Sequence, residues 1–164
     1  MTKPDVGKQE IEAAMGRIIW RWHHIEATLA QMFAALLGLP HMGEDAHLAH
    51  KVFFTPVNFR TQIDMVSTVL EHRVVDEAIR KQWRRLCNDL YTVKKWRDSC
   101  AHCTVAMDTN LNTHVAMLTP FSRKFEKPEG QMTLGQLEEA EEIIRQAGIT
   151  VAKFSRELPT FRKG

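Results

Sequence analysis

Cysteine is scarce in this sequence. The chain of 164 residues contains three cysteines, at Cys87, Cys100 and Cys103. An odd number of cysteines, all on or beside one predicted helix, does not suit a disulfide framework. We therefore expect free thiols and a reducing, cytoplasmic environment, because disulfides persist mainly in oxidising compartments.

Other features are also missing. No apolar run approaches the roughly 20 residues that a membrane-spanning helix needs, and residues 1–7 are too short and polar for the core of a signal peptide. The net charge of +2 permits an anionic ligand but is weaker than the basic footprint usual in nucleic-acid-binding proteins. The sequence has no glycine-rich phosphate loop and no nucleophile elbow. We expect a single domain over residues 1–164, with no membrane partner.

Apolar periodicity predicts helices in the first half of the chain. The clearest helix is expected over residues 8–37, where apolar side chains recur every three or four positions. The pattern is weaker over 44–53, where a short helix could form. Thr55 is then expected to cap a second long helix, with Pro56 at its first position and its end near His72.

Two further helices are expected in the second half. Asp76 is placed to cap a helix over residues 77–101. Thr133 and Gln136 have the spacing of a capping box, which predicts a last helix over 133–158.

A short β-hairpin is expected between these two helices. Residues 104–107 and 114–118 are β-prone and share a Val-Ala-Met triplet, while the residues at 108–113 are typical of a loop. Residues 120–130 are expected to form a charged loop. Four long amphipathic helices and one hairpin over about 104–118 predict an all-α fold, an antiparallel four-helix bundle with a small β-hairpin before the last helix.

Arg97, Asp98 and His102 form the most informative motif. Arg97 lies on a helical stripe otherwise occupied by apolar residues, and burying an unpaired charge there would cost several kcal/mol. Arginine can hold phosphate oxygens, and histidine can move protons at neutral pH, so these groups suit cleavage of RNA without a metal. On a straight helix, however, Arg97 and His102 are about 140° apart. We therefore expect unwinding near His102, or a second subunit that supplies the missing partner.

These three residues resemble the R-x(4–6)-H signature of the HEPN superfamily of helical-bundle proteins. In that signature a polar residue, usually Asn and sometimes Asp or His, follows the arginine, and here four residues separate Arg97 from His102. The order of elements is also similar, with long helices first, the motif near the end of a late helix, and a closing helix. The similarity spans most of the chain as a pattern of elements, but only the short motif is residue-specific.

The resemblance implies a homodimer in which two motifs meet in a cleft. In active members the arginine and histidine promote metal-independent endoribonuclease cleavage, which needs no cofactor and leaves a 2′,3′-cyclic phosphate and a 5′-hydroxyl. Many members are toxins or defence nucleases that are paired with an antitoxin protein. Asp98 stands where asparagine is commoner, and Arg97 must neutralise it because a carboxylate repels phosphate. In the other interpretation, Arg97 and Asp98 are a buried pair that fastens the bundle or dimer of a non-catalytic interaction module.

Four charged residues are candidates for RNA binding or for support of the motif. Lys94 and Lys95 precede it and continue a basic strip along the same helix, which could guide an RNA backbone or be a solvated surface. Arg21 and Glu26 lie on the first helix, where a glutamate is a natural partner for Arg97. The alternative is that Arg21 and Glu26 are ordinary charged residues on an exposed face of the helix.

The remaining clusters have simpler interpretations. Cys100, His102 and Cys103 are potential zinc ligands, but a structural zinc site generally needs four ligands, so we expect no metal. The acidic run over residues 138–142 is expected to be solvated surface near a helix N-terminus. Trp20 and Trp22 are expected to be core or interface residues.

Overall fold

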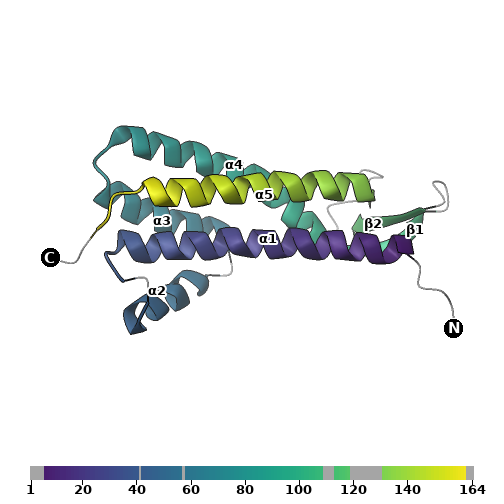
Figure 1. The fold of residues 1–164 in the computed structure, drawn as a ribbon, viewed down its shortest axis with the longest axis horizontal. Helices are drawn as coiled ribbons and strands as arrows, with labels where there is room; N and C mark the ends of the chain where they lie inside the picture. The colour runs from purple at the N-terminus through teal and green to yellow at the C-terminus, as the bar shows by residue number, and fades with distance from the viewer. Residues whose placement is uncertain (1–5, 41, 57, 109–112, 119–130, 162–164) are drawn as a thin grey trace. The chain divides into compact units, whose positions relative to one another are not determined.

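The computed structural model describes residues 6–40, 42–56, 58–108, 113–118 and 131–161, and most of them are helical. The helices are α1 (Val6–Leu36), α2 (Glu44–Phe54), α3 (Phe59–Arg73), α4 (Glu77–Ala101) and α5 (Leu134–Glu157), and the strands are β1 (Cys103–Asp108), β2 (Thr113–Leu118) and β3 (Gln131–Met132) (Figure 1). The predicted predominance of helix is therefore confirmed. None of the helices in the described part of the chain combines the length and apolarity that crossing a membrane requires.

The chain forms two compact units. Unit 1 comprises Met1–His23 and Thr92–Gln146, and unit 2 comprises His24–Tyr91 and Ala147–Gly164. Helices α1, α4 and α5 contribute residues to both units, so neither unit is one continuous stretch of sequence. The three strands belong to unit 1, whereas α2 and α3 belong to unit 2.

Local side-chain caps fix the starts of two helices, α4 and α5, as predicted. The backbone N–H of Ala78 donates to Oδ1 of Asp76 at 2.8 Å, just before α4 begins. At the start of α5, the N–H of Thr133 donates to Oε1 of Gln136 at 2.9 Å, and the N–H of Gln136 donates back to the threonine hydroxyl at 3.4 Å. These bonds satisfy donors that the first helical turn leaves without partners.

The predicted start of α3 is wrong by several residues. Thr55 has helical backbone angles, and its hydroxyl donates to the carbonyl of Lys51 at 2.9 Å, so it ends α2 and does not begin the next helix. Asn58 is the N-cap of α3: its backbone is extended and its side-chain oxygen accepts from the N–H of Arg60 at 2.9 Å. An N-cap needs a non-helical backbone, which Asn58 has and Thr55 lacks.

The hairpin forms, and a third strand extends it. Strands β1 and β2 pair antiparallel with Val105 opposite Ala116, which confirms the predicted hairpin. Asp108 and Thr113, expected in the loop, are paired at the strand ends. Strand β3, which was not predicted, adds to β2 with Met132 opposite Ala116. The predicted charged loop at 120–130 lies outside the described residues.

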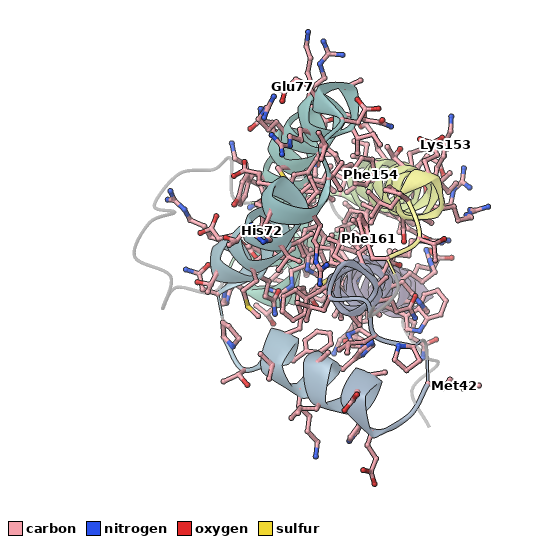
Figure 2. The ribbon with its side chains drawn as sticks, turned by 90° about the vertical axis from the view of Figure 1, so that its left-hand side faces the viewer. Met42, His72, Glu77, Lys153, Phe154 and Phe161 are labelled. Atoms are coloured by element: carbon pink, nitrogen blue, oxygen red, sulfur yellow. The ribbon has the colours of Figure 1, made fainter. Side chains whose placement is uncertain are left out.

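Each unit has its own apolar core. In unit 1 the buried residues include Ile11, Ile18, Trp22, Val93, Cys100, Val115, Leu137 and Ile144. In unit 2 Trp83 of α4 stacks on Phe154 of α5, with ring centroids 5.6 Å apart, and the indole N–H donates to the hydroxyl of Ser67 at 2.8 Å. On α5, Lys153 is exposed and the next residue, Phe154, is buried (both labelled in Figure 2). Adjacent positions on this helix thus face core and solvent, as an amphipathic helix requires.

Candidate functional site

Arg97 lies near the end of α4, in unit 1, where it continues the buried stripe of that helix. Its side chain is 35% exposed, and its Nη1 donates to Oδ1 of Asp98 at 3.1 Å. The Nε is buried and has no hydrogen-bond partner among the described residues. The hydrogen-bond partner of Arg97 among the described residues is therefore the next residue in the sequence, Asp98, and part of the arginine side chain remains accessible to solvent.

The carboxylate of Asp98 lies between two cations. Its Oδ1 accepts from Arg97, and its Oδ2 forms an ion pair with Nζ of Lys94, one helical turn earlier. All three side chains belong to α4, so neither ion pair ties one helix to another. Two positive charges and one negative charge leave this cluster, here called the Asp98 cluster, with a net charge of +1.

His102 lies just beyond the end of α4. The helix ends at Ala101, and the backbone N–H of His102 donates to the carbonyl of Ser99 at 3.2 Å, the three-residue spacing of a tightened last turn. The next residue, Cys103, already belongs to β1. The imidazole of His102 is exposed. Because His102 lies beyond the helix, the angle of about 140° calculated between Arg97 and His102 on a straight helix does not determine the direction of the imidazole.

Two of the supporting candidates lie on α1, in different units. Nε of Arg21 donates to Oε1 of Glu141 at 2.8 Å, and Nε of Arg17 donates to Oε2 of the same carboxylate at 2.7 Å. Arg21 thus joins α1 to α5 within unit 1. Glu26 is half-buried in unit 2, whereas Arg97 belongs to unit 1.

Glu141 is the residue that sequence reasoning missed. The acidic run was expected to be solvated, and most of it is exposed, but the side chain of Glu141 is only 13% exposed. Burial by itself would raise its pKa, but the hydrogen bonds and charges of Arg17 and Arg21 bring the pKa below its usual value. Its position gave a signal, because it follows Leu137 by four residues and precedes Ile144 by three, on the buried side of the helix.

The basic residues along α4 have different partners, so they do not form one continuous basic surface. Arg80 donates to the carbonyls of Val74 and Glu71, at 2.6 and 2.7 Å, and so caps the end of α3. Arg84 forms an ion pair with Glu77. Lys95, by contrast, is exposed, and it makes no ion pair with any described residue.

The thiols of Cys100 and Cys103 have raised pKa values and are therefore weakly reactive. Burial raises the pKa of the Cys103 thiol to about 11. Burial, with a smaller contribution from Cys103, raises that of Cys100 to about 12. Nucleophilic attack requires the thiolate, which is rare at neutral pH when the pKa is this high. The part of the chain that the structure describes contains no group of three or more His, Cys, Asp or Glu residues able to hold a metal ion.

The tryptophans of α1 have different environments. Trp22 is 1% exposed, as a core residue should be, whereas Trp20 is 59% exposed. An exposed tryptophan is a candidate interface residue, since its large apolar surface is otherwise in contact with water.

The Asp98 cluster can therefore hold an anion through Arg97, and His102 can accept or donate a proton at a helix end. No protein-family model matches this chain, and neither curated proteins nor solved structures give a match to it.

Proposed function

We propose that this chain is a metal-independent endoribonuclease of HEPN type, with an antiparallel four-helix bundle, acting as a homodimer. One observation carries the proposal. Arg97 continues a buried stripe, yet its ion pair joins it to an adjacent residue of the same helix and leaves a third of its side chain exposed. A charge kept there at a desolvation cost, without fastening two elements, favours a ligand over a scaffolding role.

The residue roles follow from the chemistry. The ribose 2′-oxygen forms a bond to phosphorus while the bond from phosphorus to the 5′-oxygen breaks, which gives a 2′,3′-cyclic phosphate and a 5′-hydroxyl. Arg97 binds the non-bridging oxygens and neutralises the charge that grows on them. His102 takes the 2′-proton or supplies one to the 5′-oxygen. Asp98 holds the guanidinium of Arg97.

The second subunit would complete the site. Cleavage needs one group to accept a proton and one to donate a proton, and each chain offers one His102. In a homodimer, two copies of the motif would supply two arginines and two histidines to one cleft. An antitoxin protein is then the proposed partner that covers this cleft in the cell.

The test is cleavage of single-stranded RNA by the purified protein in EDTA. Arg97→Ala and His102→Ala should each lower the rate by ~100-fold or more, the usual scale for a lost charge-stabilising or proton-transfer group. DNA and RNA with a 2′-O-methyl group at the cleaved nucleotide should resist, because neither has the attacking hydroxyl. Both variants must keep the circular dichroism and sedimentation of the wild type for their rates to count.

The alternative is a non-catalytic interaction module, and one observation in unit 2 favours it. A cavity of about 250 Å³ lies between α1 and α2, lined by Phe33, Leu37, Leu39, Asp45, Leu48, Ala49 and Val52. Leu48 is 60% exposed and Val52 is 46% exposed, so α2 presents apolar surface to solvent. Inertness towards every RNA, together with loss of the dimer in Arg97→Ala, would favour this alternative.

A further inference from the structure

We propose that Lys94 is a positioning residue: it neutralises and orients Asp98, so that Arg97 keeps its charge for phosphate. The inference rests on the proposed function, and it assigns Lys94 a task other than direct contact with RNA. Lys94 therefore acts through Asp98, and Asp98 acts through Arg97.

The geometry of the Asp98 cluster separates these roles. Each carboxylate oxygen has its own cation, with Lys94 at Oδ2 and Arg97 at Oδ1. Lys94 is the least exposed of the three, at 27% of its side chain, and its ammonium group already faces the carboxylate. Lysine and aspartate four residues apart on a helix are neighbours on its surface, so this pairing needs no support from another element.

Lys94 determines the net charge of the Asp98 cluster. Without Lys94, Asp98 and Arg97 would form a neutral pair, and an approaching phosphate would meet a carboxylate beside the guanidinium. With it, the cluster keeps a net positive charge, and the carboxylate is held at both oxygens. A fixed carboxylate in turn fixes the guanidinium, and a preorganised charge stabilises a transition state better than a mobile one.

A double-mutant cycle tests this inference. The proteins are the wild type, Lys94→Gln, Asp98→Asn and the double variant, with glutamine chosen because it removes the charge but keeps the first two methylene groups of the half-buried stem. Lys81→Gln is the matched control, since Lys81 is an exposed lysine on the same helix and has no ion pair with any described residue. The measurements are kcat/KM for RNA cleavage in EDTA and the Kd of an RNA with 2′-O-methyl riboses, read by fluorescence anisotropy.

Lys94→Gln should lower kcat/KM and weaken RNA binding by about three- to fivefold, as expected for loss of a partly exposed ion pair. In the Asp98→Asn background the same change should cost less than twofold, because no carboxylate remains to be neutralised. Lys81→Gln should stay within twofold of the wild type.

An equal loss from Lys94→Gln in both backgrounds would show direct contact with RNA and overturn the inference. A loss no larger than that of Lys81→Gln would also overturn it. If the wild type binds RNA without cutting it, the proposed nuclease fails, but the binding cycle still decides the role of Lys94. A wild type that neither binds nor cuts RNA overturns both.

Discussion

Replacing Glu141 by glutamine should destabilise the protein, because this carboxylate joins α1 to α5 in unit 1. It accepts from Arg21, whose side chain is 30% exposed, and from Arg17, which is 47% exposed. An exposed ion pair contributes up to ~1 kcal/mol, and a hydrogen bond to a charged group ~1.5–3 kcal/mol. Discounting both pairs for solvent screening and for the bond that glutamine can still accept, we expect a loss of about 1.5 kcal/mol at pH 7.

The dependence of this loss on pH gives a stricter test. The pKa of Glu141 is lowered in the folded protein from its ordinary value of 4.5. Its contribution is therefore fully present above that value and disappears as the pH falls through the folded pKa. The difference between wild type and Glu141→Gln should shrink on acidification below about pH 4.5.

Urea unfolding followed by circular dichroism measures the change, and thermal unfolding should show a Tm lower by about 3–6 °C. Glu139→Gln is the control, because Glu139 is exposed on the same helix. If Glu141→Gln and Glu139→Gln have equal stability at pH 7, the two arginine contacts contribute nothing, and the reasoning is refuted. Arg21 would then be available as an RNA-binding group.

Four further predictions concern assembly, thiol reactivity, zinc content and packing. Sedimentation at micromolar concentration should show a dimer, and a monomer would remove the model of a site shared by two subunits. Native protein at pH 8 should react slowly with a thiol reagent such as iodoacetamide at Cys100 and Cys103, because thiols with pKa values of about 12 and 11 are protonated there; rapid labelling of either would contradict this. Elemental analysis should find no stoichiometric zinc, and zinc that is lost in Cys103→Ala would contradict the expectation. Phe154→Ala should lower the free energy of unfolding by ~3–5 kcal/mol, since it removes the ring stacked on Trp83; a loss below 1 kcal/mol would show that the stack is unimportant.

Local features of the sequence predicted most of the helical structure. The three- and four-residue periodicity identified α1 and α4 almost to their ends, and the caps at Asp76 and Thr133 form hydrogen bonds with residues two or three positions away. These features are predictable because both partners lie within one turn of the same helix. The start of α3 was missed because Thr55 and Asn58 are both acceptable caps, and only the backbone angles distinguish them.

Strand β3 could not be predicted by the same reasoning. It has only two residues, Gln131 and Met132, which is too short for a period of two to be recognised. It is a strand because β2 offers it hydrogen-bonding partners, and that is a property of the assembled sheet.

The sequence by itself determined which residues form the Asp98 cluster, because Lys94, Arg97 and Asp98 meet within one turn of a single helix. It also placed His102 at the helix end. Only the tertiary structure decided the environment of Arg21, whose partner Glu141 is 120 residues away in the chain. Helix geometry fixes neighbours three or four residues apart, but it carries no information about which distant carboxylate a side chain will meet once the helices pack.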